Sequence, residues 1–403
     1  MDRLFGESSK QKIGFGDLVV GLYIVAIFVF ENREFSTLFS IIQLLYFGYL
    51  AYLIFTTKKL PFNVATKWII AVLFFTFAFW LFGANAYVNA TSFVVLKNLL
   101  KALGIIYYLY VKRNSDHIIH IIAIAGVICG AFITASFIAN PLQTLDLKYA
   151  TNSRVGAEIA GGNVNIVAMN MCFAFAACVY CAFNNEKKGK RIFWYICMAF
   201  IAISSFLTGS RKVILSFLVM FIVANKGTKL RYKILGLLSL AAVYWLLMNN
   251  ESLYFLLGHK IDFFSNDAYK LYEGSDSVRR NLIAGAWDMF SQKPWGNGFG
   301  CVQEKLGLYA HNNFLEVLAS LGLLGFIAYY SIYFWGLIKS YKNRLDGKCF
   351  YCAYTLVGVL ILELTQITCY YPMIYVFISL MVYVLLDNQM TFSAEQITKV
   401  DGN

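Results

Sequence analysis

His311 is one of four histidines in the chain, and it closely precedes an apolar run that begins at Phe314. A run of this kind predicts a helix, so His311 should lie at or just before the helix N-terminus. The field of a helix N-terminus lowers the pKa of an imidazole. A neutral imidazole can accept a proton, which makes His311 a candidate general base. A capping or interfacial role for His311 is the alternative.

Arginines border apolar sequence at several separate places. They are Arg154, Arg211, Arg279 and Arg280. The guanidinium group is planar and permanently charged, and its fork of N–H donors fits the oxygens of a phosphate. If arginines from three distant turns meet at one face, they would form a clamp for a diphosphate. The alternative is that each arginine pairs with a lipid headgroup or with a nearby acid.

Residues 279–292 have the spacing of an amphipathic helix that lies along a membrane surface. Its apolar positions are Leu282, Ile283, Ala286, Trp287 and Phe290. Ser275 or Ser277 could cap this helix, which would place Arg279 and Arg280 at its N-terminus. Positive charge there opposes the helix dipole, and a bound anion would relieve the conflict. The alternative is an ordinary interfacial helix whose arginines reach headgroups.

Charged residues inside apolar runs are a further group of candidates. Lys97 and Lys101 are four residues apart, so they share one face of a predicted helix. Lys97 could pair with Glu363 or line a cavity with it. The alternative is that these side chains snorkel or form a simple structural pair.

The remaining sequence predicts the scaffold that holds these residues. Hydrophobic residues make up 59% of the 403 positions and charged residues only 14%, whereas soluble domains carry about a quarter charged residues. Long apolar runs bounded by Lys and Arg predict an all-α integral membrane protein. We predict twelve transmembrane helices, at residues 14–30, 35–55, 68–83, 92–111, 117–139, 163–183, 192–207, 211–225, 234–248, 313–338, 349–368 and 371–387.

The Lys and Arg residues outside residues 249–312 predict the orientation. Most of them lie in the two termini and in the connections after even-numbered helices. Positive segments resist translocation, so both termini are predicted to be cytoplasmic. Residues 249–312 then form one long extracytoplasmic loop in a single membrane domain spanning 1–403. The net charge of +12 reflects this bias and not a nucleic-acid surface.

The acidic residues and cysteines do not predict a cofactor. Residues 249–312 contain no paired acidic motif of the kind that holds a metal with a nucleotide sugar. Most cysteines fall inside apolar runs, where they are expected to be core residues. Cys301 and Cys369 are predicted on the same side of the membrane, where they could form a disulfide.

Several short motifs occur in a characteristic order along the chain. They are Asn163-x-Asn165 after Arg154, Thr208-Gly-Ser-Arg211, Arg279 fifteen residues before Pro294, Gly296-x-Gly298-x-Gly300, His311-Asn312-x-x-Leu315-Glu316 and Gly322-x-x-Gly325. In order and spacing they resemble the O-antigen polymerase and O-antigen ligase superfamily of bacterial membrane glycosyltransferases. The resemblance extends over most of the chain. Lys212 departs from it, because a small residue more usually follows the arginine.

The resemblance implies a GT-C-like fold in the inner membrane with its active site on the periplasmic face. It implies a metal-independent, inverting polymerase of O-antigen or capsular polysaccharide. Such an enzyme moves a glycan from undecaprenyl diphosphate to the non-reducing end of another lipid-linked repeat unit. Arg211, Arg279 and His311 match the functional positions of the family and are the predicted catalytic residues.

Further residues are expected to bind the substrate. They are Arg154, Arg280, Asn312, Lys97, Gly298 and Gly300. The glycines would let the backbone approach the sugar-diphosphate closely. The expected partners are the lipid-linked donor and acceptor, membrane lipid, a chain-length regulator and a flippase.

Two other functions remain open. The first is an O-antigen ligase, which would transfer the finished glycan to lipid A-core or another acceptor. The second is a transporter or flippase for lipid-linked sugars. Transporters commonly break paired helices near the midplane. The four prolines of this chain all lie in connections or at helix ends, which disfavours the transporter.

Overall fold

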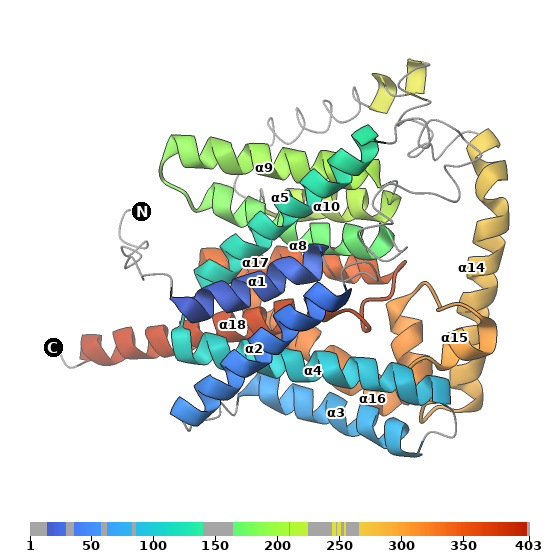
Figure 1. Ribbon diagram of the computed structural model, residues 1–403, viewed down its shortest axis with the longest axis horizontal. Helices are drawn as coiled ribbons and strands as arrows, with labels where there is room; N and C mark the ends of the chain where they lie inside the picture. Colours follow the sequence, from blue (N-terminus) through green and yellow to red (C-terminus); the bar gives the residue numbers. More distant parts are fainter. Residues whose placement is uncertain are drawn as a thin grey trace.

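The computed structural model describes residues 14–29, 36–57, 63–82, 86–139, 164–208, 210–224, 244–246, 248–250, 254 and 266–400. Within these ranges the fold consists of helices and connections, with no strand. The helices form a bundle (Figure 1). They are α1 Phe15–Val29, α2 Ser36–Thr57, α3 Val64–Phe82, α4 Ala86–Lys112, α5 Ser115–Ala139, α8 Val164–Phe183, α9 Lys188–Leu207, α10 Arg211–Ala224, α14 Asn266–Gln292, α15 Cys301–Leu306, α16 Asn313–Lys342, α17 Gly347–Glu363 and α18 Pro372–Val400.

The predicted apolar spans largely coincide with helices where the structure describes them, but the span predicted at 349–368 is too long, because α17 ends at Glu363 and residues 364–368 form a turn. Most of the predicted span 234–248 lies outside the described residues. Seven of the described helices are long and apolar enough to cross a membrane. Three shorter apolar helices cover Phe15–Val29, Lys212–Ala224 and Pro372–Leu386. A helical fold is therefore confirmed for the described residues and is consistent with a multi-pass membrane protein, whereas the twelve spans and their orientation stay predictions.

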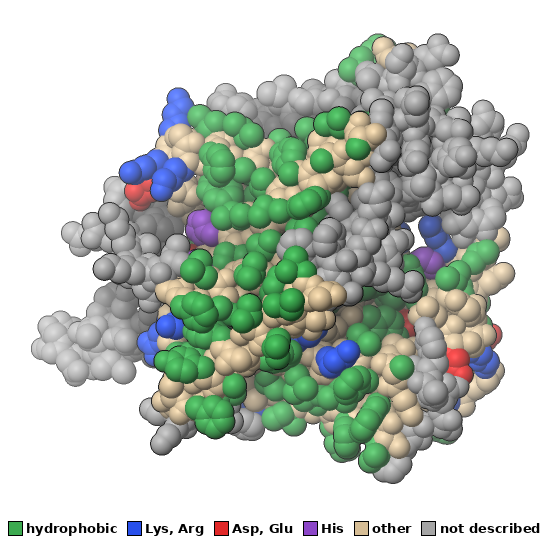
Figure 2. Space-filling model, in the orientation of Figure 1, with side chains coloured by type: hydrophobic (Ala, Val, Ile, Leu, Met, Phe, Trp, Pro, Cys, Tyr) green, Lys and Arg blue, Asp and Glu red, His purple; other side chains and the backbone are tan. Residues whose placement is uncertain are grey.

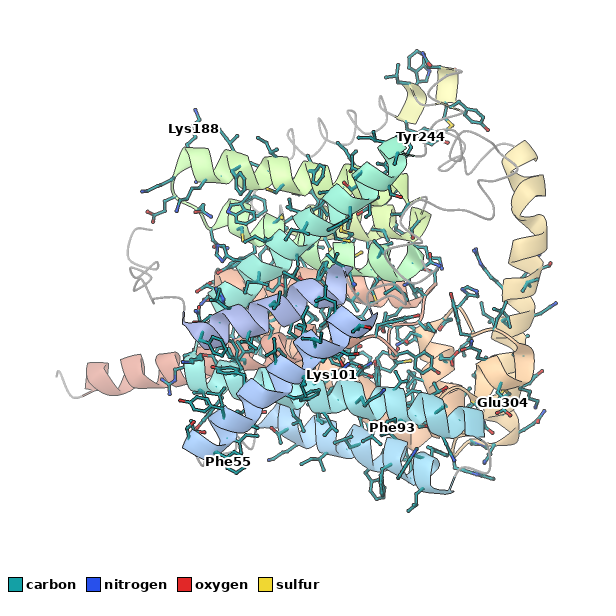
Figure 3. All side chains as sticks on the ribbon, in the orientation of Figure 1. Phe55, Phe93, Lys101, Lys188, Tyr244 and Glu304 are labelled. Carbon is teal, nitrogen blue, oxygen red and sulfur yellow. The ribbon has the colours of Figure 1, made fainter. Side chains whose placement is uncertain are left out.

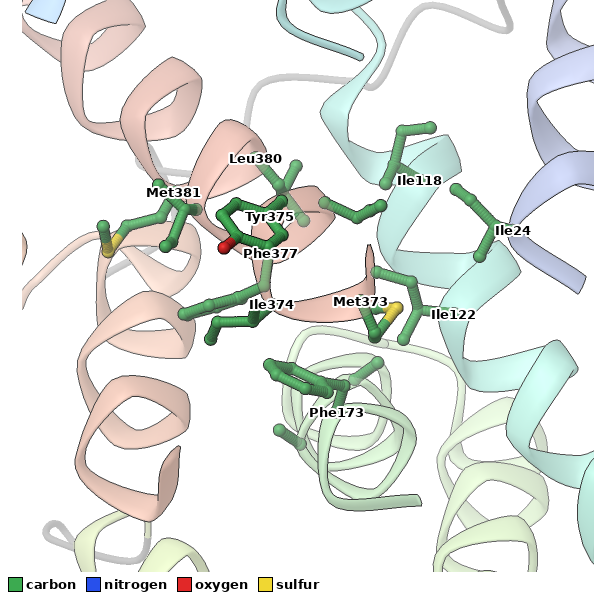
Figure 4. Packing of buried hydrophobic residues seen from close by; sticks show 14 of the residues in the cluster. Ile24, Ile118, Ile122, Phe173, Met373, Ile374, Tyr375, Phe377, Leu380 and Met381 are labelled. Carbon is green, nitrogen blue, oxygen red and sulfur yellow. The ribbon is translucent and has the colours of Figure 1, made fainter. Parts of the chain in front are cut away.

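Two helices form the centre of the bundle because they are apolar on all sides. Nearly every residue of α8 from Val167 to Ala182 is buried, and so is the first half of α18. A helix that is apolar all round is suited to the interior of a bundle or to lipid, and here neighbouring helices cover both. Figure 4 shows α18 residues such as Met373 and Phe377 packed against Phe173 of α8 and Ile122 of α5. Other helices expose large side chains on their outer faces, as Figure 2 shows for one side.

Different elements lie at the two ends of the bundle. At one end Lys348, near the start of α17, pairs with Asp116, near the start of α5, at 2.7 Å. Tyr180, near the end of α8, donates to the same Asp116 at 2.8 Å. Helices α14 and α15 lie at the opposite end (Figure 1). Lys188 and Glu304 mark these two ends in Figure 3.

A break in α16 joins the glycine run 296–300 to the bundle. Gly322 has φ 69° and ψ −175°, so the helix is interrupted there. Carbonyl groups freed by such a break need other donors. The Ala319 and Ser320 oxygens accept from the Asn297 N–H at 3.1 and 3.0 Å, and Ser320 accepts from Gly298 N–H at 2.7 Å. The run thus fixes the first half of α16.

Replacing Gly322 with alanine should destabilise the protein strongly. A Cβ there would lie 2.3 Å from the Trp295 carbonyl carbon and 2.4 Å from the Pro294 oxygen, both backbone atoms. Gly307 is the matched control, since it has φ 79° and no atom within 4 Å of its added Cβ. We expect Gly307→Ala to cost about 1 kcal/mol of strain, and Gly322→Ala about 1–3 kcal/mol more. Thermal unfolding of the detergent-solubilised variants would measure this difference, and equal midpoints would contradict it.

Candidate functional site

His311 lies in the short connection between α15 and α16, as the sequence predicts. Asn312 is the N-cap of α16, and its side chain accepts from the Leu315 N–H at 3.1 Å. His311 has φ 55°, a left-handed conformation that is uncommon for a residue with a side chain. Its ring packs on Tyr309 with centroids 4.3 Å apart. The backbone therefore turns sharply at His311 just before the helix starts.

The turn after α17 brings a second element to His311. Asn312 Nδ2 donates to the Leu364 oxygen at 3.2 Å. Lys212, in the first turn of α10, donates from Nζ to the adjacent Thr365 oxygen. Neighbouring carbonyl groups of one turn thus bind side chains from the starts of α10 and α16. This arrangement places the Lys212 ammonium close to the His311 segment.

Gln366 joins the start of α8 to the same turn. Its Nε2 donates to the backbone oxygen of Asn165 at 2.6 Å. Asn165 belongs to the motif Asn163-x-Asn165, although Asn163 lies outside the described residues. The starts of α8, α10 and α16 therefore meet around residues 364–366.

The imidazole of His311 is held in its neutral form. Burial, and to a lesser extent the positive charges of Lys212 and Arg279, together lower its pKa from 6.5 to about 4. Its Nδ1 is buried and bonds to no other described group. Figure 2 shows a histidine beside Lys or Arg side chains next to α14. A neutral imidazole subject to the positive charges of two cations from different helices is the central feature of this site.

The predicted start of the helix at 279 is wrong. Helix α14 begins at Asn266, so Arg279 and Arg280 lie in its interior and not at its N-terminus. No proline separates residues 266 and 279, and the helix continues through Ser275 and Ser277. The argument that these arginines oppose the dipole at a helix start therefore does not hold. The position of Arg279 depends instead on the face of α14 on which it lies.

The predicted apolar face of this helix divides into a buried part and an exposed part. Leu282, Ala286 and Met289 are buried, and α14 packs there against α16 and α15. Ile283 and Trp287 are 37% and 52% exposed. The buried positions follow spacing of four and three residues, so the stripe that faces protein is narrower than the apolar stripe in the sequence. The extra apolar residues point away from the bundle.

The other predicted cations are placed differently from Arg279. Arg280 is exposed, whereas Arg279 is partly buried. Arg211 is the first residue of α10, but its side chain lies outside the described part of the structure. Arg154 lies outside the described residues entirely. The clamp of three separate arginines therefore stays a prediction, with Lys212 as a cation that the prediction did not include.

Lys97 does not pair with Glu363. The Lys97 side chain is exposed, with its Nζ 5.1 Å from the centre of the Phe93 ring. Glu363 is fully buried and accepts from the hydroxyl groups of Tyr330 at 3.0 Å and Tyr333 at 3.1 Å. The expected pairing fails because tyrosines of α16 supply the donors that a buried carboxylate needs. Binding of substrate by Lys97 stays a prediction.

The predicted glycines have a clear packing role. Gly298 and Gly300 have φ 91° and 88°, and a Cβ on them would overlap Val88 and Thr91 of α4. Because these two residues have no side chains, Val88 and Thr91 of α4 can pack closely against them. Close approach of their backbone to a sugar-diphosphate stays a prediction. Substrate binding by Asn312 also stays a prediction.

Three residues of the site have no role in the predictions from sequence. Lys212 is noted there only as a departure from a family pattern, and Glu316 only as part of a motif. Tyr370 is absent. Glu316 accepts from Ala310 N–H at 2.9 Å and from the Tyr370 hydroxyl at 2.6 Å. The short polar turn after α17 is the one signal in the sequence that could have suggested a contact there.

The described residues include no group of three or more His, Cys, Asp and Glu side chains that could hold a metal ion. The nine cysteines are free and buried. Cys301 Sγ lies 3.9 Å from Ser320 Oγ, so the disulfide considered for Cys301 and Cys369 is not formed. Metal-independent chemistry stays a prediction.

Comparison with protein families relates this site to a known activity. The family model for O-antigen ligase matches residues 196–330. This confirms the resemblance to the O-antigen polymerase and ligase superfamily, and the matched segment contains Lys212, Arg279 and His311. No curated protein matches the chain significantly. At a coarse level the match indicates polymerase- or ligase-type activity on lipid-linked glycans.

Proposed function

Because residues 196–330 match the O-antigen ligase family, we propose that this protein is a membrane glycosyltransferase. It transfers a glycan from a polyprenyl diphosphate to a hydroxyl group of an acceptor. One observation carries the proposal: His311 adjoins the turn that Lys212 and Asn312 both bind, and burial with the positive charges of Lys212 and Arg279 keeps its imidazole neutral. A proton acceptor beside two cations suits a reaction that deprotonates a hydroxyl and releases a diphosphate.

The transfer step can be written for these residues. The acceptor oxygen forms a bond to the anomeric carbon while its proton passes to the imidazole of His311. The bond between the anomeric carbon and the diphosphate oxygen breaks, and the electron pair leaves with the diphosphate. Lys212 and Arg279 stabilise the negative charge that grows on this oxygen. Attack from the face opposite the diphosphate inverts the anomeric centre.

We favour a polymerase of lipid-linked repeat units in O-antigen or capsule synthesis, with undecaprenyl diphosphate as the lipid. The growing glycan is then transferred to the non-reducing end of another repeat unit. The site faces the periplasm in this proposal. The basic side chains Lys348, Arg191 and Arg344 at the opposite end of the bundle support that orientation. Arg154 and Arg211 are proposed as further contacts to the diphosphate.

A ligase is the second candidate, and the description of the matching family favours it. The donor chemistry is the same, but the acceptor is lipid A-core or another final carrier. Surface polysaccharide of a deletion strain separates the two. A single repeat unit on the final acceptor indicates a polymerase. Long chains that stay on undecaprenyl diphosphate indicate a ligase.

Purified protein with lipid-linked repeat units tests the proposal directly. We expect longer glycans to form on the lipid, as detected by gel electrophoresis and mass spectrometry. If no product forms with any acceptor while vesicles containing the protein move lipid-linked sugars across the bilayer, the enzyme proposal is wrong and the transporter is favoured.

The pH dependence of transfer follows from the pKa of His311. The reactive imidazole is neutral, and its pKa in the free protein is lowered to about 4. We therefore expect kcat/KM to stay constant from pH 8 to about pH 5 and to fall as the pH drops through about 4.

A bound diphosphate would offset the charges of Lys212 and Arg279, so the pKa of His311 rises in the complex. The acid limb of kcat should therefore lie at a higher pH than that of kcat/KM. A limb of kcat/KM near 6.5 would contradict this environment for His311.

A further inference from the structure

A buried carboxylate holds the backbone next to His311. Glu316 lies in the first turn of α16 and has no exposed surface. Its Oε2 accepts from the backbone N–H of Ala310 at 2.9 Å. Burial of a carboxylate is costly unless donors satisfy it. Glu316 is satisfied by groups that belong to other segments, so it ties those segments together.

The second oxygen of Glu316 extends this connection across the bundle. Oε1 accepts from the hydroxyl of Tyr370 at 2.6 Å. The same hydroxyl accepts from Gly300 N–H at 3.0 Å. The Tyr370 backbone oxygen accepts from Asn98 Nδ2, in α4, at 2.9 Å. Glu316 therefore links the His311 segment to the glycine run and to α4 through Tyr370.

The conformation of His311 needs such a restraint. A left-handed backbone at a residue with a side chain costs about 1 kcal/mol or more and persists only where the surroundings impose it. Ala310 is fixed by Glu316 on one side of His311, and Asn312 is fixed by Leu364 and Leu315 on the other. With both neighbours held, the direction of the Cα–Cβ bond of His311 is fixed, which restricts where its imidazole can lie.

We propose that Glu316 is a positioning residue, which holds Ala310 so that the His311 imidazole faces Lys212 of α10 and Arg279 of α14. This inference rests on the proposed function and adds a residue to it. The carboxylate does not touch the reacting atoms. It acts through the hydrogen bond to Ala310, and Tyr370 orients it.

Substitutions of Glu316 separate geometry from charge. The amide oxygen in Glu316→Gln can still accept from Ala310, so kcat should stay within about threefold of wild type. Glu316→Ala removes the acceptor and should lower kcat about a hundredfold with little change in the donor KM, because a misplaced catalytic group costs that much. Tyr370→Phe should cost about tenfold, similar to the loss of an orienting partner at a metal-bound histidine. Glu304 is an exposed residue on α15 (Figure 3), so Glu304→Ala is the control and should leave kcat unchanged.

A readout without catalysis tests the same link. Diethyl pyrocarbonate modifies neutral imidazoles, and mass spectrometry of the peptide reports His311 alone. In wild type we expect the midpoint of labelling near pH 4, because burial and the charges of Lys212 and Arg279 lower the pKa of His311. In Glu316→Ala the ring should leave this environment, and the midpoint should move towards 6.5. Tyr370→Phe should shift it in the same direction.

The outcomes distinguish this inference from the proposed function. An unchanged labelling midpoint and kcat in Glu316→Ala would overturn the positioning role. So would a Glu316→Gln variant as impaired as Glu316→Ala, since charge and not geometry would then matter. If wild type transfers no glycan but the labelling midpoint still moves, the proposed function fails and the link from Glu316 to His311 stands.

Discussion

His311→Ala is expected to lower the rate of glycan transfer by at least about a hundredfold, because general base catalysis typically contributes that much. The donor KM should change little, since Lys212 and Arg279 remain to bind the diphosphate. Removing the imidazole leaves the acceptor hydroxyl without a group that takes its proton at neutral pH. Steady-state transfer with purified protein and lipid-linked donor measures both constants.

His120→Ala is the control for this substitution. His120 lies in α5 at the opposite end of the bundle, where its ring packs on Trp194 with centroids 5.7 Å apart and its Nδ1 bonds to the backbone oxygen of Asp116 at 2.7 Å. It should leave transfer unchanged. A loss of less than about fivefold in His311→Ala would contradict a role as general base. Such a result would assign His311 to positioning the acceptor.

The position of His311 could be predicted from the sequence because the signal is local. Asn312 is a favoured N-cap residue and Phe314 begins an apolar run, so the start of α16 is encoded within a few residues. The apolar spans were predictable for the same reason, since length and hydropathy alone identify a membrane helix. Each of these features depends on neighbours in the sequence.

The contacts that make the site could not be predicted in this way. Lys212 reaches Thr365, and Glu316 reaches Tyr370, across long separations in the chain. No local pattern specifies which connections of a helical bundle meet. Pairing of Lys97 with Glu363 was one possibility, and it does not form, because a charged residue inside an apolar run does not establish which helices are neighbours.

The start of α14 was mispredicted for a different reason. Serine before an apolar stripe is a good cap signal, but serine is also tolerated inside a helix. The helix continues through Ser275 and Ser277 to Asn266. The consequence matters for the site: Arg279 is placed by the face of α14 that packs on α16, which is also the helix that follows His311.

Arg279→Ala is expected to abolish detectable polymer while the protein still inserts in the membrane. Removing one preorganised group that stabilises the charge of the leaving group typically costs about a hundredfold or more in kcat. Arg279→Lys keeps the charge but loses the planar fork, so it should restore only part of the activity. Arg279→Ala should raise the pKa of His311, because the charge at 279 lowers it in wild type, whereas Arg279→Lys keeps a positive charge and should change the pKa less.

Arg280→Ala is a matched control, since Arg280 is adjacent on the same helix but exposed. It removes the same charge from the same part of the chain, so any effect of net charge or of insertion is shared by the two variants. Polymer in the membrane fraction, measured against the amount of inserted protein, compares the two variants.

Arg280 was also predicted to bind substrate, and the two positions lie about 100° apart around the helix axis. Because Arg279 is partly buried and Arg280 is exposed, we expect a diphosphate held beside His311 to depend more strongly on Arg279. Near-normal polymer from Arg279→Ala, or equal losses from both substitutions, would show that α14 acts through its overall charge and that Arg279 does not bind the leaving diphosphate beside His311.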